Sequence, residues 1–166
     1  MEKAEGIIKK LNLLPHPEGG YFKEIYRSSE SIHKDSLPDR YKGDRNFSTS
    51  IYFLLVKNQR SLFHRLLSDE IWHFYDGSPI IIHCIDDNGY SSFKLGKETD
   101  AGEEYQHCIK AGTWFAAEIE DKNSYALIGC TVAPGFDFAD FTLALRSEMS
   151  KLYPEFDELI IRFTKE

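Results

Sequence analysis

The segment 64–77 places an imidazole and a carboxyl group close together in sequence, among aromatic residues. Alternate side chains on a strand share a face, and a turn at Ser68-Asp69 reverses the chain. If His64 and Glu70 both face a cavity, burial and mutual charge shift their pKa values and suit them to general acid–base chemistry. A buried ion pair without chemical use is the alternative interpretation.

Hydroxyl groups on the preceding strand are the next candidates. Ser50 and Tyr52 share a face of the expected strand 48–56, so both can contact a ligand, with Tyr52 as a proton donor. A core tyrosine bonded to a backbone carbonyl is the alternative for Tyr52. Three aromatic residues are candidates for lining the same pocket, or for ordinary core packing: Trp72, Phe74 and Phe115.

Polar residues nearer the N-terminus complete the set. Glu24 and Arg27 fall on opposite phases of the expected strand 21–27, so we expect at most one to point inward, and Glu24 is the candidate ligand contact. His16 and Glu18 lie in a Pro- and Gly-rich turn. We interpret them first as residues that shape the turn and second as ligand contacts.

Short strands separated by turn residues must position these groups. An amphipathic helix is expected over 2–14, and apolar residues at helical spacing predict another over 156–163. The polar segment 28–46 is a candidate mobile flap. Many short, regularly spaced strands indicate a sandwich or barrel; besides the two above, they are expected at 61–67, 70–75, 80–85, 91–95, 106–109, 113–117 and 125–132.

Composition excludes several functions. The chain has 166 residues, a net charge of −7 and no dense basic cluster, which argues against nucleic-acid binding. No apolar run reaches the roughly 20 residues needed to span a bilayer, so no membrane partner is expected. Three scattered cysteines and an N-terminus without a signal-peptide pattern indicate reduced thiols in a cytoplasmic protein. No repeat or linker interrupts the chain, so we expect one domain over 1–166.

Two motifs resemble those of the cupins. The first cupin motif, His-x-His, three or four residues, Glu, six residues, Gly, is similar to 64–77, with Leu66 in place of the second His. The second motif, Pro-x-Gly-x-x-His, is similar to 110–115. There Gly112 is kept, and Phe115 stands where the last His would be.

More specifically, the chain resembles the cupin-5 family, whose function is unknown. The resemblance covers most of 11–141 and rests on four segments: 14–21, 49–55, 68–74 and 129–138. It implies an all-β jelly-roll barrel (a double-stranded β-helix) and, as is common among cupins, a homodimer. It implies no established activity.

The same resemblance bears on metal binding. A typical cupin site uses three His and one Glu, and of these the chain keeps His64 and Glu70. Two protein ligands are too few for a stable site, which normally needs three with an open position. We therefore expect no metal and no other cofactor.

Two main functions remain. The first is a metal-independent enzyme acting on a small polar metabolite, by analogy with the cupin deoxysugar-nucleotide epimerases, in which a His removes a proton beside a carbonyl and a Tyr returns one. His64 would be the base, Glu70 its orienting or acidic partner and Tyr52 the proton donor. The second is a non-catalytic module that binds a carbohydrate or nucleotide-like ligand. A metal-dependent oxygenase or isomerase ranks last.

Overall fold

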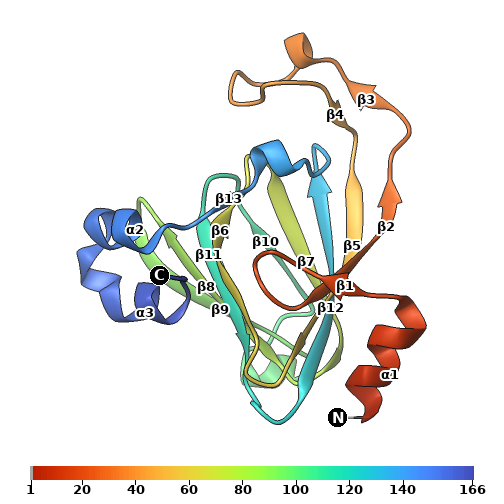
Figure 1. The fold of residues 1–166 in the computed structure, drawn as a ribbon, viewed down its shortest axis with the longest axis vertical. Helices are drawn as coiled ribbons and strands as arrows, with labels where there is room; N and C mark the ends of the chain where they lie inside the picture. Colours follow the sequence, from red (N-terminus) through yellow and green to blue (C-terminus); the bar gives the residue numbers. More distant parts are fainter. Residues whose placement is uncertain (1) are drawn as a thin grey trace.

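The computed structural model describes residues 2–166 as two antiparallel sheets that face each other in a jelly-roll barrel (Figure 1). The six-stranded sheet has the order β1 (Leu14–Pro15), β2 (Tyr21–Arg27), β5 (Thr49–Val56), β12 (Tyr125–Ala133), β7 (Asp69–Gly77) and β10 (Gln106–Ile109). The five-stranded sheet has the order β13 (Thr142–Leu143), β6 (Arg60–Arg65), β11 (Trp114–Ile119), β8 (Ile80–Asp86) and β9 (Gly89–Leu95). The expected all-β jelly roll is confirmed.

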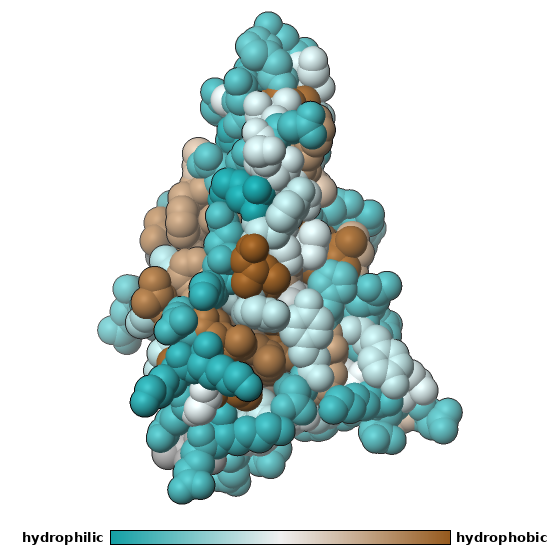
Figure 2. All heavy atoms as spheres, turned by 90° about the vertical axis from the view of Figure 1, so that its right-hand side faces the viewer, coloured by the Kyte–Doolittle hydropathy of each residue, from teal (hydrophilic) through white to brown (hydrophobic). Residues whose placement is uncertain are grey.

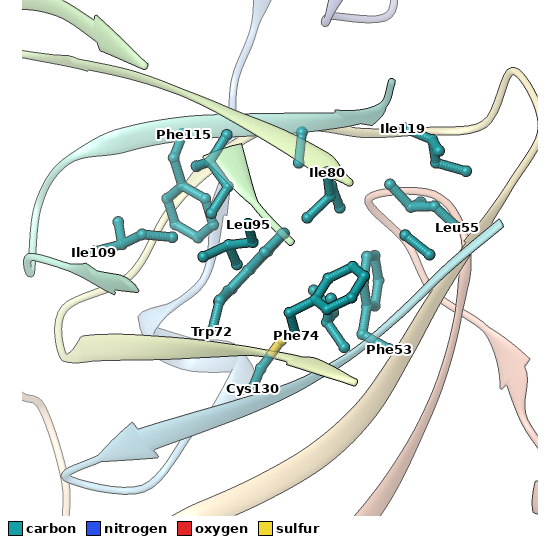
Figure 3. Close-up of a cluster of buried hydrophobic side chains, with 14 of the residues drawn as sticks. Phe53, Leu55, Trp72, Phe74, Ile80, Leu95, Ile109, Phe115, Ile119 and Cys130 are labelled. Atoms are coloured by element: carbon teal, nitrogen blue, oxygen red, sulfur yellow. The ribbon is translucent and has the colours of Figure 1, made fainter. Parts of the chain in front are cut away.

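The main hydrophobic core lies between the two sheets. Because side chains alternate across a strand, each core strand sends every second residue inward. Phe53 of β5, Trp72 of β7 and Phe115 of β11 meet there, and Figure 3 shows their rings packed between the sheets. Phe74 and Cys130 belong to the same core.

Short helices cover parts of the outer sheet surfaces. α1 (Glu2–Leu11) packs through Ala4 on one end of the six-stranded sheet. α2 (Arg146–Leu152) and α3 (Asp157–Arg162) pack through Met149 and Ile160 on the outer surface of the five-stranded sheet. Among residues 2–166, no helix is long and apolar enough to cross a membrane.

The segment 28–46 rises above the barrel as a hairpin (Figure 1) and holds the two short strands β3 (Ser31–Ile32) and β4 (Arg45–Asn46). Tyr41 is fully buried, and its hydroxyl donates a 3.0 Å hydrogen bond to the Leu67 carbonyl. Arg45 forms a buried bidentate pair with Asp140, with bonds of 2.5 and 2.6 Å. The hairpin is thereby fixed to the barrel at two places.

Candidate functional site

One end of the barrel interior contains a cavity of about 260 Å³. Its deeper wall combines apolar side chains with four buried or half-buried titratable ones. The titratable side chains are His16, Glu18, His64 and Glu70. The segment 136–141, which holds the exposed Phe138, lies at the mouth. The hairpin 28–46, expected as a candidate flap, contributes no lining residue within the described chain.

The turn between β1 and β2 brings Glu18 into the cavity. Gly19 and Gly20 have φ angles of 113° and 73°, and a Cβ at Gly20 would lie 2.7 Å from the Leu54 carbonyl oxygen. Only glycine suits such a close approach at positive φ. The turn therefore presses against the barrel, and the Glu18 carbonyl accepts a 2.8 Å hydrogen bond from the Leu62 amide.

Glu18 is the carboxyl group that contacts His64. Its Oε2 lies 3.1 Å from His64 Nε2 and 3.5 Å from His16 Nδ1, and its Oε1 accepts a 2.8 Å hydrogen bond from the Ser61 hydroxyl. The expected partner of His64 was Glu70. The structure corrects this, because the turn that carries Glu18 folds back across β6. The signal in the sequence was the Gly19-Gly20 pair beside a histidine and a carboxyl.

One proton is shared between His64 and Glu18. His64 Nδ1 lies 2.7 Å from the Leu62 carbonyl oxygen; because that oxygen only accepts, Nδ1 carries a proton. Burial lowers the pKa of His64 to about 3. Burial, together with the charge of Glu70, raises the pKa of Glu18 well above its usual 4.5. The pair is therefore a neutral imidazole accepting at Nε2 from a protonated Glu18.

Glu70 lies on β7 and also lines the cavity. It is 7% exposed, and its Oε2 has no hydrogen-bond partner among the described residues. Burial raises the pKa of Glu70 to about 7, although the Trp72 indole and the Cys130 thiol beside the carboxyl group partly offset this rise. A carboxyl group that is half ionised near neutral pH can both give and take a proton, which makes Glu70 the better base of the site.

A salt bridge borders the mouth. Arg27 donates from Nε and Nη2 to the two carboxylate oxygens of Glu24, at 3.0 and 2.7 Å, and both residues line the cavity. Strand alternation allowed at most one of them to face inward. The β-bulge between Glu24 and Tyr26 shifts the register against β5, so the expectation was wrong for this strand.

The hydroxyl candidates on β5 lie on the other face. Thr49, Ile51 and Phe53 line the cavity, so Ser50 and Tyr52 point outward. Tyr52 packs with the cluster under α1 and lies 6.1 Å from the ring of Tyr75. The expectation that these hydroxyls face a ligand is corrected, because the more apolar phase of the strand fills the barrel.

The aromatic candidates divide between wall and core. Trp72 lines the cavity, and its buried Nε1 has no hydrogen-bond partner among residues 2–166, whereas Phe74 packs in the core and does not line the cavity. Phe115 lies behind His64, with ring centroids 4.0 Å apart, and does not line the cavity.

The donor set does not fit the metal of a typical cupin. Leu66 and Phe115 carry no donor atom, and both ring nitrogens of His64 have partners in the protein. Residues 2–166 contain no group of three or more His, Cys, Asp and Glu side chains arranged to hold a metal.

A jelly-roll barrel with a cavity built on His64 and Glu70 defines a cupin. The model of the Cupin superfamily (DUF985) matches residues 5–144, and the chain belongs to this family. An uncharacterised protein of Saccharomyces cerevisiae is 32% identical over 145 residues, 82% of this chain and 72% of its own. A hypothetical protein from Leishmania major and a protein from Shewanella oneidensis are each 32% identical, with TM-scores of 0.86 and 0.87. Each alignment covers 98% of this chain, and respectively 99% and 97% of the other.

Proposed function

We propose that this cupin binds a small molecule in its cavity and transfers a proton on it, as an isomerase or epimerase does. Glu70 is the base, and the Glu18–His64 pair is the proton donor. The observation that supports this most directly is the unpartnered Oε2 of Glu70, buried in the cavity with a pKa of about 7.

The assignment of roles follows from the protonation states. His64 is a poor base near neutral pH, because its pKa is about 3 and Glu18 bonds its Nε2. Ionised Glu70 can instead accept a proton from a carbon beside a carbonyl, as the electron pair of the broken C–H bond moves onto the carbonyl oxygen. Protonated Glu18 then donates toward that oxygen. In an α-hydroxycarbonyl compound, Glu70 next delivers its proton to the former carbonyl carbon while Glu18 takes the proton of the neighbouring hydroxyl group, which completes an isomerisation without any redox change.

Exchange with solvent deuterium tests this function. Small carbonyl compounds that are neutral, anionic or amine-bearing are incubated with the protein in buffered D2O, and proton NMR follows the signals of the hydrogens beside the carbonyl. We expect at least one compound to exchange, at a rate that Glu70→Gln lowers and that Glu148→Gln leaves unchanged. Glu148 is exposed on α2, outside the residues that line the cavity. No exchange with any compound, or equal exchange by Glu70→Gln, would contradict the proposal.

A non-catalytic binding module is the second candidate. The aromatic wall formed by Phe22, Phe53 and Trp72 supports it, because such walls bind ligands without chemistry. In a thermal-shift screen of the same compounds, ligands that raise the melting temperature but never exchange hydrogen would favour this function.

We also propose a homodimer in the cytoplasm. α1 covers only one end of the six-stranded sheet, and Tyr26, Ile71 and Tyr75 remain exposed on this sheet. Figure 2 shows that apolar side chains lie among polar ones on the face that carries β2 and α1. Light scattering after size exclusion measures the mass of the protein in solution; a monomer at micromolar concentration would contradict the dimer.

The location in the cytoplasm is proposed from the cysteines. Cys84, Cys108 and Cys130 are free thiols, which suits a reducing compartment.

A further inference from the structure

The charges on the cavity wall indicate which ligands it accepts. Four carboxyl groups line it, those of Glu18, Glu24, Glu70 and Asp137, against one guanidinium, that of Arg27. The two imidazoles add no positive charge near neutral pH, because burial lowers both of their pKa values. The net charge of the wall is therefore negative.

The guanidinium is already occupied. Besides its bidentate contact with Glu24, Arg27 donates from Nη1 to Asn46 Oδ1 at 2.8 Å and to the Phe136 carbonyl at 3.0 Å. The carboxylate of Asp137 also faces it, which adds to the rise in the pKa of Arg27 caused mainly by Glu24. Arg27 thus serves to hold the mouth together. A phosphate or carboxylate on a ligand would find no free cation on this wall.

The Glu70 carboxyl group on the deeper wall can accept a hydrogen bond from a ligand. Glu70 is more than nine-tenths buried, lines the cavity, and has an Oε2 without a hydrogen-bond partner among residues 2–166. A buried carboxylate oxygen in this state is costly unless a donor reaches it. An ammonium group supplies that donor together with the opposite charge.

The rest of the wall suits the body of such a ligand. Aromatic rings surround the cavity on several sides, and ring faces attract cations as well as apolar groups. These rings belong to Phe22, Phe53, Trp72, Phe136, Phe138 and Phe141. Trp72 Nε1, which is buried beside Glu70 and has no hydrogen-bond partner among residues 2–166, can donate to an oxygen of the ligand.

We propose that the cavity takes a small organic cation, an amine on an apolar body, with its ammonium group on Glu70 and its body among the aromatic rings. This inference rests on the proposed function in one respect, that the cavity binds a small molecule. It names the class of ligand and disfavours anionic ligands such as nucleotide-sugars.

Three probes of matched shape test the ligand class: benzylamine, benzyl alcohol and benzoate. Calorimetric titration at about pH 8, where Glu70 is ionised, gives their affinities. We expect benzylamine to bind at least ~10-fold more tightly than benzyl alcohol, and benzoate not to bind. Glu70→Gln should abolish the preference for the amine, and Glu148→Gln should keep it. Carbon-13 NMR of the wild-type protein gives a readout that needs no variant, because saturating benzylamine should lower the pKa of Glu70.

The inference is overturned if benzyl alcohol or benzoate binds as tightly as benzylamine, if none of the three binds, or if the preference survives in Glu70→Gln. A pKa of Glu70 that stays constant on saturation with benzylamine also overturns it. The proposed function is decided separately by hydrogen exchange. Exchange into a neutral or anionic compound would uphold proton transfer while rejecting the cationic ligand.

Discussion

A histidine contacts a glutamate on each surface of the five-stranded sheet, in different charge environments. On the outer surface both residues belong to the sheet, whereas on the inner surface the glutamate comes from the turn between β1 and β2. Inside, His64 Nε2 lies 3.1 Å from Glu18. Outside, His83 Nε2 lies 3.4 Å from Glu118, beneath the C-terminal helices. Both histidines are buried, and burial lowers the pKa of each.

The carboxyl groups respond in opposite directions because only one of them has cations nearby. Burial tends to raise the pKa of Glu118, but hydrogen bonds and charges from Lys122 and Arg162 outweigh it and lower the pKa overall. The Lys122 contact is 2.7 Å, and Arg162 bonds the other oxygen. Glu18 has no such cations beside it, so burial and the charge of Glu70 raise its pKa, and the hydrogen bond from Ser61 offsets this only in part. The outer pair is therefore held by cations, whereas the inner pair retains its proton, as the proposed proton transfer requires.

The largest expected difference concerns proton transfer. Glu18→Gln removes the transferable proton but keeps the shape of the side chain. For any compound that the wild-type protein exchanges, we expect Glu18→Gln to lower the exchange rate by about 10²–10⁴-fold. Glu118→Gln should leave the rate within about twofold, because Glu118 faces away from the cavity. Equal rates for the two variants, measured by proton NMR in D2O, would contradict the assignment.

The pH dependence of folding stability should reveal the raised pKa of Glu70. The pKa of Glu70 in the folded protein, about 7, is above its usual 4.5. Between these two pH values Glu70 is protonated in the folded state and ionised in the unfolded state, so the folding stability falls as the pH rises. The two pKa values correspond to about 3 kcal/mol, lost between about pH 5 and pH 8. His16 and His64 act in the opposite direction, so the comparison is wild type against Glu70→Gln by urea unfolding. The variant should become relatively more stable as pH rises; a constant difference would show that Glu70 titrates normally.

At neutral pH, we expect Glu118→Gln to lower the folding stability more than Glu18→Gln does, which is the reverse of their order for hydrogen exchange. Glu118→Gln weakens the contacts with Lys122 and Arg162, and we expect a loss of about 1–2 kcal/mol, since both cations are part exposed and screened by solvent. Glu18→Gln should cost less than about 1 kcal/mol, because a neutral amide can still donate to His64 and accept from Ser61. Denaturant melts of the two variants measure this, and a larger loss for Glu18→Gln would indicate an ionised inner pair.

The smallest effect is expected at Tyr52. Its side chain faces away from the cavity, so Tyr52→Phe should change the exchange rate by less than about twofold. A loss comparable to that of Glu18→Gln would restore Tyr52 as the proton donor and would require a different arrangement of β5.

The strands were predictable because apolar alternation and turn residues are local signals. The expected ranges 21–27 and 106–109 coincide with β2 and β10, and the other expected strands differ by one or two residues at their ends, whereas the two-residue strands β1, β3, β4 and β13 were not expected. Which face of a strand points inward was less predictable. In β5 both phases are largely apolar, because α1 covers Leu54 on the outer face while Phe53 fills the barrel.

The site was predicted only in part, for a physical reason. His64, Glu70, Trp72 and Glu24 were chosen from strand phase and the resemblance to cupins. All four line the cavity, and their roles toward a ligand stay predictions. The contact between His64 and Glu18 depends on where a glycine turn comes to rest against the barrel, which alternation within strands does not specify.

Carbon-13 NMR of the glutamate carboxyl groups, followed across pH in the wild-type protein, tests the central claim most directly because it reports both pairs together. We expect Glu118 to be ionised throughout the neutral range, Glu70 to titrate near pH 7, and Glu18 to stay protonated at pH values well above its usual pKa of 4.5. Full ionisation of Glu18 and Glu70 at about pH 5.5, alongside Glu118, would show that the cavity holds no usable proton and would contradict that claim.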